Sequence, residues 1–270
     1  MSNIPFVYRK KLNIPSNIRF GLELELDKIN PDEVYKLVRK EFGNTWIIKE
    51  DKGLTKGENR ELVSPVLTNT KETWIMLKKM ADLLKKINPD YRHCSFQINF
   101  DGEMLPSPKT RLRFLKLYAM YEDIIYRFSK GGDEDYRDSL EMYASPIALS
   151  LKQDPSKSIK ETLEEYINQK RYGIAFKDTP KDLIEFRTPN MTDNVCLWQN
   201  YVTFFYYLLN LVHSGKINMR EVDEYINSYS RIYILENYEK EKEEKALQLS
   251  KKLFCNSTDR INFMHQYLGK

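Results

Sequence analysis

Residues 19–26 have the sequence Arg-Phe-Gly-Leu-Glu-Leu-Glu-Leu, in which apolar side chains alternate with small or acidic ones. Because successive side chains of a strand point to opposite faces, this alternation predicts a β-strand with one buried face. The other face would carry Glu23 and Glu25, whose Cα atoms lie about 6.6 Å apart in a strand. The stretch therefore predicts a sheet with two carboxylates on one of its faces.

Three further predicted strands each add polar residues, and two of them, Cys94–Phe100 and Asp182–Arg187, alternate as residues 19–26 do. They are Glu58–Val63 with Glu61, Cys94–Phe100 with Gln97 and Asn99, and Asp182–Arg187 with Glu185 and Arg187. If the polar faces of the four strands coincide, their oxygen atoms suit a hard divalent cation such as Mg²⁺. Acidic residues on the water-facing side of an antiparallel sheet are also ordinary, so the pattern alone leaves both interpretations open.

Helices and two short strands account for most of the remaining chain. The predicted helices are Pro31–Phe42, Thr68–Ile87, Pro108–Phe128, Ile159–Asn168, Val195–Val212 and a charged one around Glu239–Lys245, and the short strands are Trp46–Lys49 and Arg171–Phe176. Antiparallel-compatible strands separated by helices favour an α+β fold with helices on one face of the sheet. Without repeats or linkers, residues 1–270 are expected to form one domain, with a core at about 18–213 and a helical extension at 214–270.

Composition narrows the classes of function. The chain of 270 residues carries 43 basic and 39 acidic residues, a net charge of +4, which is not the strong positive charge of a typical nucleic-acid binder. Its three cysteines are dispersed, which favours a reducing compartment over a disulfide framework. The apolar stretch Tyr201–Val212 is too short to span a bilayer, and no apolar run precedes Asn13. We therefore expect a cytoplasmic protein that binds neither nucleic acid nor membrane.

Known motifs for other chemistries are absent from the sequence. The three histidines and three cysteines are too scattered for a zinc site, and neither phosphate-binding glycine motif nor a nucleophile elbow occurs. Carboxylates, amides and arginines remain as the groups that could act. A minor alternative is nucleic-acid binding through basic residues on predicted helices, namely Lys78, Lys79, Lys85, Lys86, Lys109, Arg111, Arg113 and Lys116.

Several short segments occur in one characteristic order along the chain. They are Phe20-Gly-Leu-Glu-Leu-Glu25, Trp46, Asp51, Glu61-Leu-Val-Ser-Pro65, Cys94-Ser-Phe-Gln-Ile-Asn99, Arg137, Tyr143-Ala-Ser-Pro146, Arg171-Tyr172 and Glu185-Phe-Arg187. In this order they resemble the amidoligase family, relatives of glutamine synthetase and glutamate–cysteine ligase in the carboxylate–amine ligase superfamily. The resemblance covers about residues 18–213.

The resemblance implies a fold like the catalytic domain of glutamine synthetase and an ATP- and Mg²⁺-dependent ligase. The carboxylate of a small molecule or peptide would be activated as an acyl phosphate, and an amine or ammonia would then displace phosphate to give an amide or isopeptide bond. The implied roles are metal binding by Glu23, Glu25, Glu61 and Glu185, catalysis by Arg187, Asp51 and Glu185, and cofactor binding by Gln97, Asn99, Arg187, Arg171 and Arg137.

One departure from the family pattern concerns proton transfer. The family has two histidines where this chain has Gln97 and Asn99, which can bind a ligand but cannot titrate near neutral pH. The alternative is therefore a catalytically silent relative that binds nucleotide or peptide. Asp51 is equally well explained as a turn cap, and surface roles are open for Arg137 and Arg171. The sequence also leaves the oligomeric state open.

Overall fold

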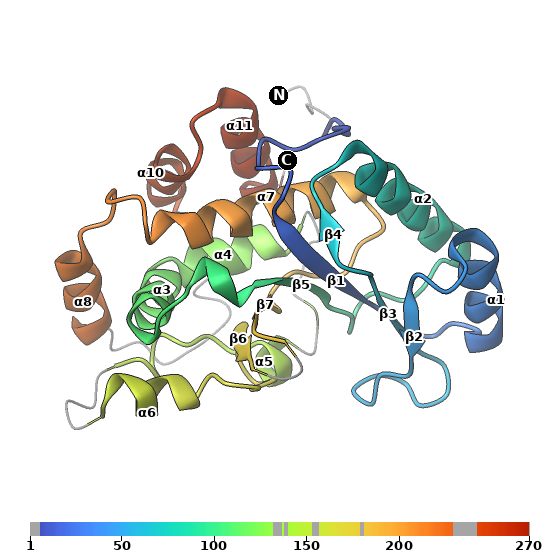
Figure 1. Ribbon diagram of the computed structural model, residues 1–270, viewed down its shortest axis with the longest axis horizontal. Coiled ribbons are helices and arrows are strands. Elements are labelled where there is room, and N and C mark those ends of the chain that lie inside the picture. The colour runs from blue at the N-terminus through green and yellow to red at the C-terminus, as the bar shows by residue number, and fades with distance from the viewer. Residues whose placement is uncertain are drawn as a thin grey trace.

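The computed structural model describes residues 6–131, 137, 140–152, 157–178, 181–228 and 242–269. Its centre is an antiparallel sheet in the order β2-β3-β1-β5-β7-β6, with the short β4 also paired to β1 (Figure 1). The strands are β1 (Arg19–Leu26), β2 (Ile47–Lys49), β3 (Arg60–Val63), β4 (Leu67–Thr68), β5 (Phe96–Asp101), β6 (Ile174–Lys177) and β7 (Leu183–Phe186).

Helices α1 to α6 lie between strands of the sheet in the chain, and α7, α8, α10 and α11 follow its last strand. The described helices are α1 (Pro31–Phe42), α2 (Lys71–Ile87), α3 (Pro108–Met120), α4 (Glu122–Ser129), α5 (Leu140–Tyr143), α6 (Ile159–Glu164), α7 (Val195–Leu211), α8 (Met219–Ser228), α10 (Glu243–Leu253) and α11 (Ser257–Tyr267). Within the described ranges, no helix combines the length and the apolar character needed to cross a bilayer.

The register of the sheet brings the predicted polar faces together. β1 lies between β3 and β5, so that Glu25 is opposite Glu61 and Glu23 is opposite Gln97. On the next pair of strands, Asn99 of β5 is opposite Glu185 of β7. Directly opposed side chains of an antiparallel pair lie on the same face. The polar residues of four strands therefore share one face of the sheet.

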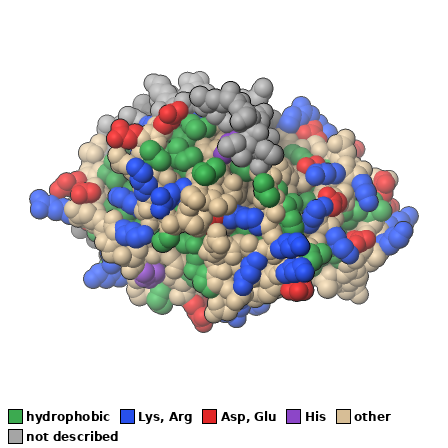
Figure 2. Space-filling view, turned by 90° about the horizontal axis from the view of Figure 1, so that it is seen from above, with side chains coloured by type: hydrophobic (Ala, Val, Ile, Leu, Met, Phe, Trp, Pro, Cys, Tyr) green, Lys and Arg blue, Asp and Glu red, His purple; other side chains and the backbone are tan. Residues whose placement is uncertain are grey.

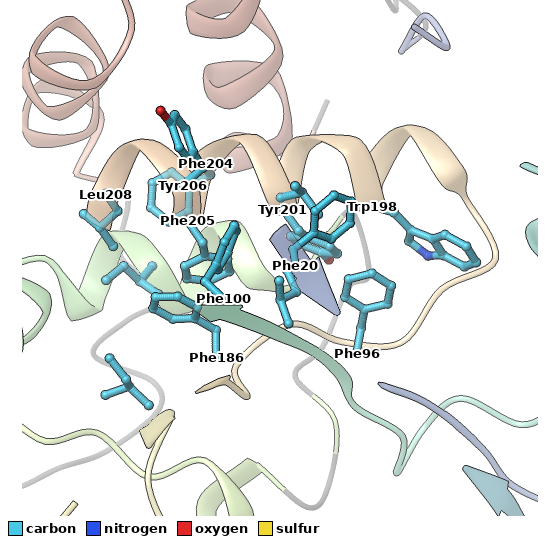
Figure 3. Packing of buried hydrophobic residues seen from close by; sticks show 14 of the residues in the cluster. Phe20, Phe96, Phe100, Phe186, Trp198, Tyr201, Phe204, Phe205, Tyr206 and Leu208 are labelled. Carbon is cyan, nitrogen blue, oxygen red and sulfur yellow. The ribbon is translucent and has the colours of Figure 1, made fainter. Parts of the chain in front are cut away.

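The other face of the sheet is apolar and packs against α7. Figure 3 shows the rings of Phe96, Phe100 and Phe186 directed from the sheet toward the aromatic side chains of this helix. Phe186 stacks on Phe205 with ring centroids 4.2 Å apart, and Phe96 meets Tyr201 at 5.6 Å. Such rings each bury a large apolar area and fix the helix on the sheet. The predicted α+β class with an antiparallel sheet is confirmed, and α7 covers the apolar face of that sheet.

Local sequence signals explain where the helices begin. The Asn30 side chain accepts hydrogen bonds from the backbone N–H groups of Asp32 and Glu33, and Pro31 occupies the first turn of α1. Asn194 caps α7 in the same way through the Cys196 N–H. The boundaries of α1 and the start of α7 agree with those predicted.

One predicted helix is wrong. The segment Pro108–Phe128 forms two helices, α3 and α4, which meet at Tyr121, where φ is −109° and ψ is 13°. The break allows the buried Glu122 to accept hydrogen bonds from the backbone N–H groups of Ile147 and Ala148. This tertiary contact outweighs the helical propensity of the segment.

Burial raises the pKa of Glu122 to about 8, whereas an ordinary glutamate in an unfolded chain titrates near 4.5. The stability due to the retained proton is complete below about pH 4.5 and is lost as pH rises through about 8. Relative to Glu122→Gln, we expect the wild-type free energy of unfolding to fall by about 1 kcal/mol per pH unit across this window. Urea unfolding of both proteins from about pH 5 to about pH 8 measures this. Parallel pH profiles would show that Glu122 is ionised in the folded protein.

The C-terminal helices share the main core. α10 and α11 pack against α7, and α11 also packs against α4. The hydrophobic cluster runs from Leu12 to Tyr267, and an ion pair between Arg9 and Asp259 joins the start of the chain to α11. In the predicted charged helix, residues 239–241 lie outside the described residues, and the helix α10 begins at Glu243.

Candidate functional site

The polar face of the sheet holds one connected set of charged and amide side chains, which we call the sheet network. Its members are Lys49, Glu61, Glu23, Asn99, Lys177, Glu185, Arg187, Gln97 and Glu25. These residues come from six strands, with Arg187 directly after β7. Most of them are buried, and the fractional exposure of Glu185 is only 1%. The predicted convergence of the four glutamates with Gln97, Asn99 and Arg187 is therefore present.

Arg187 is held by three elements. Its Nη1 donates to Glu185 Oε1 at 2.7 Å and to Gln97 Oε1 at 2.9 Å, and its Nε donates to the Tyr143 carbonyl at 3.1 Å. Gln97 Nε2 in turn donates to Glu25 Oε1 at 2.7 Å, so the amide bridges a cation and an anion. Burial works to lower the pKa of Arg187, but the Glu185 carboxylate outweighs it and raises that pKa. The guanidinium is thus charged and fixed in position.

Glu23 and Glu61 form a hydrogen-bonded carboxyl pair on β1 and β3. Burial and the neighbouring Glu23 raise the pKa of Glu61. Burial also works to raise the pKa of Glu23, but the hydrogen bond from Glu61 and the charges of Lys177 and Lys49 outweigh it and lower that pKa. Two carboxylates so close cannot both ionise cheaply, and the proton stays with Glu61.

Long side chains reach across the polar face of the sheet. Adjacent strands lie about 4.8 Å apart, so three spacings would put β6 about 14 Å from β1 in a flat sheet. Lys177 of β6 nevertheless reaches Glu23 Oε1 of β1 at 3.3 Å, and it also pairs with Glu185. On the other side Lys49 of β2 lies 3.0 Å from Glu61 Oε1 and 3.9 Å from Glu23 Oε2. Side chains from both edge strands therefore meet over the central strand.

Asp51 and Glu25 lie near the end of this network. Glu25 Oε2 accepts the Ser95 N–H at 2.6 Å, and burial raises the pKa of Glu25. Asp51 accepts the N–H of Gly53 at 2.6 Å, which is the arrangement of a turn cap. The Asp51 charge also acts to raise the pKa of Glu25. Asp51 is thus near the network, and its turn explains its presence without a catalytic role.

Two arginines expected to contact a cofactor, Arg137 and Arg171, are held by other partners in the described contacts. The buried Arg137 donates to the carbonyls of Arg187 at 2.7 Å and Thr188 at 3.0 Å, so its guanidinium supports the chain that follows β7. The side chain of Arg171 is exposed and lies over the Tyr172 ring. Neither makes a hydrogen bond or ion pair with the side chains of the network in the described contacts. Arg137 lies close enough to Glu25 for its charge to act to lower the pKa of that carboxyl, and the cofactor contacts expected for Arg137 and Arg171 stay predictions.

The ligand types of the network suit a divalent metal, but lysines occupy the carboxylates that would bind it. Carboxylate oxygens are ligands that Mg²⁺ prefers, and the buried Asn99 Oδ1 is an acceptor without a hydrogen-bond partner. Lys49 and Lys177 lie against the same carboxylates. Among the residues that the structure describes, no three His, Cys, Asp or Glu side chains form a group that could hold a metal ion. A metal would need the lysines to move.

Sequence reasoning missed Lys49 and Lys177. Both lie on edge strands, where a lysine is usually explained by solvent exposure. The register places Lys49 opposite Glu61, and Ala175, two residues before Lys177, opposite Glu185. The period of two then puts each lysine on the polar face, but only once the strand order is known.

Four of the eight basic residues considered for nucleic-acid binding form ion pairs with acids in the described contacts. Lys78, Lys79, Arg111 and Lys116 form ion pairs with Asp82, Glu41, Asp182 and Asp223 respectively. Figure 2 shows basic side chains in separate groups with acidic ones among them on the face that it presents. These pairs reduce the positive charge that a nucleic acid could contact.

A comparison with protein-family models finds no match to this chain, and a comparison with curated protein sequences finds none either. The likeness to the amidoligase family therefore depends on the short motifs and on the positions of their residues alone.

Proposed function

We propose that this protein is an ATP- and Mg²⁺-dependent carboxylate–amine ligase whose site is the sheet network. The observation that carries the proposal is the meeting of Glu23, Glu25, Glu61 and Glu185 with Arg187 on one buried face. These residues belong to separate motifs, and the register of one sheet unites them. A stable surface would not require four carboxyl groups in such a place, because burying charge is costly.

The chemistry of the network suits a reaction between anions. A ligase of this kind must bring the carboxylate of an acid next to the γ-phosphate of ATP, which needs cations held in fixed positions. Arg187 supplies a planar guanidinium whose geometry is set by Glu185, Gln97 and the Tyr143 carbonyl. The carboxylates supply binding for Mg²⁺ or for the ammonium form of the amine. The products would be ADP, phosphate and an amide or isopeptide.

ADP release tests the proposal. We expect purified protein with Mg²⁺ and ATP to release ADP only when both an acid and an amine are present, because the amine displaces phosphate from the activated acid. A matrix of small carboxylates and peptides against ammonia and primary amines would identify the active pair. Omission of either partner from that pair provides the control. Equal ADP release with water alone would indicate a simple ATPase.

A catalytically silent relative is the second candidate, favoured by the state of Gln97. This residue bridges Glu25 and Arg187 without any titratable group, so the strand offers no proton carrier near neutral pH. Binding of Mg²⁺–ATP without ADP release across the whole matrix would favour this candidate.

The proposal includes a cytoplasmic location, where ATP is supplied. The absence of disulfides among Cys94, Cys196 and Cys255 supports it. The identity of the acid and the amine depends on loops outside the network.

A further inference from the structure

Lys49 and Lys177 come from opposite edges of the sheet and meet at one carboxylate. Lys49 lies 3.9 Å from Glu23 Oε2, and Lys177 lies 3.3 Å from Glu23 Oε1. Each lysine also has a partner of its own, Glu61 for Lys49 and Glu185 for Lys177. The two ammonium groups thus occupy the middle of the acidic cluster.

The two lysines balance the charge of the network. Four carboxyl groups, those of Glu23, Glu25, Glu61 and Glu185, of which Glu61 keeps its proton, face three cations, those of Lys49, Lys177 and Arg187. A divalent ion added to this set would place two further positive charges beside two ammonium groups. Like charges at such separations repel strongly in a partly buried site. A divalent ion and the lysines therefore exclude each other.

The lysines are also the members of the network best able to move. The side chain of Lys49 is 50% exposed and that of Lys177 is 29% exposed, whereas that of Arg187 is 7% exposed and held by three partners. A lysine has a long flexible stem and a compact point charge. Each ammonium group can leave its carboxylate by rotation of its own side chain, without a change in the sheet.

A buried acceptor without a hydrogen-bond partner lies beside Glu23. Asn99 donates its Nδ2 hydrogen to Glu23 Oε1 at 2.8 Å, but its Oδ1 has no hydrogen-bond partner although only 7% of the residue is exposed. Native proteins rarely leave such an oxygen unsatisfied. Asn99 Oδ1 is an oxygen ligand available for a metal ion or an ammonium group beside Glu23.

We propose that Lys49 and Lys177 are exchangeable counter-cations of the site. Without ligand they neutralise Glu23 and Glu185 and contact the protonated Glu61, and with a divalent ion and a nucleotide bound they would release these carboxyl groups and contact the phosphates instead. The ion-exchange part depends only on the network, whereas the phosphate part rests on the proposed function. Lys49 and Lys177 are thus positioning residues for the ion and binding residues for the anion.

Manganese binding without nucleotide tests the exchange. Titration of Mn²⁺ followed by electron paramagnetic resonance should show roughly tenfold tighter binding in Lys49→Met and Lys177→Met than in wild type, because the competing cation is gone. Lys177→Arg keeps the charge and should bind Mn²⁺ as wild type does. Lys78→Met, which removes a surface lysine paired with Asp82, is the matched control and should change nothing. Circular dichroism verifies that each variant is folded.

A second titration uses a non-hydrolysable ATP analogue with Mg²⁺. Both methionine variants should bind it at least about tenfold more weakly than wild type, since each lacks one phosphate contact. Unchanged or weaker Mn²⁺ binding in both methionine variants, or no Mn²⁺ binding in any protein, would overturn the exchange even if ADP release were found. Tighter Mn²⁺ binding in a protein that never binds nucleotide would support the exchange and reject the ligase proposal.

Discussion

Replacing Arg187 by Met is expected to lower the free energy of unfolding by about 3 kcal/mol. The change removes the buried cation that contacts Glu185 and Gln97. Among the described contacts, the Glu185 carboxylate, which is 1% exposed, then keeps Lys177 as its one ion-pair partner. The expected loss of stability is at the lower end of the range for broken buried ion pairs, because Lys177 remains beside Glu185. Urea unfolding followed by circular dichroism measures the effect.

Arg171→Met is the matched control for this prediction. Arg171 is an exposed arginine that lies over the Tyr172 ring, so its loss should change the stability by no more than about 0.5 kcal/mol. Equal effects of the two substitutions would mean that Arg187 is not part of a buried ionic network. The paired experiment therefore tests the geometry of the site independently of any activity.

Replacing Phe186 by Ala should destabilise the protein by roughly 3–5 kcal/mol. Phe186 lies between Glu185 and Arg187 in the chain but points to the opposite face, where it packs against Phe100 and Phe205 (Figure 3). Removal of its ring leaves a cavity beneath α7 that the surrounding rings can fill only in part. Urea unfolding of the variant gives the loss directly.

Phe186→Leu serves as the comparison, because it keeps most of the side-chain volume. We expect its loss of stability to be less than half of that of Phe186→Ala. If both variants lost the same amount, the effect would come from the backbone of β7 and not from a cavity. A loss below about 1 kcal/mol in Phe186→Ala would contradict the packing of α7 on the sheet.

The sequence predicted the elements whose signals are local. β1 has the bounds expected from the alternation in residues 19–26, and α1 begins after Asn30 and at Pro31. The split between α3 and α4 could not be predicted, since Tyr121 is neither Gly nor Pro and the break depends on contacts of Glu122 with a distant segment. The two-residue strand β4 carries too short a pattern to stand out.

The acidic residues, the two amides and Arg187 of the candidate site were predictable from the sequence, but its two lysines were not. A period of two puts Glu23 and Glu25, or Glu185 and Arg187, on one face without knowledge of the fold. The partners of these residues depend on strand order and on the reach of long side chains, as where Lys177 of the edge strand β6 contacts Glu23 of β1. The sequence therefore pointed to magnesium as the counter-ion, whereas the structure places lysines beside the carboxylates.

Comparison of ADP release by wild type and Glu185→Gln tests the proposed ligase most directly. With the acid and amine pair that supports turnover in the wild type, Glu185→Gln should release ADP at least about a hundredfold more slowly, because Glu185 orients Arg187 and offers a carboxylate to the ligand. Glu33→Gln, a change of an exposed acid on α1, should leave the rate unchanged. A folded Glu185→Gln variant with the wild-type rate would contradict the assignment of the sheet network as the active site.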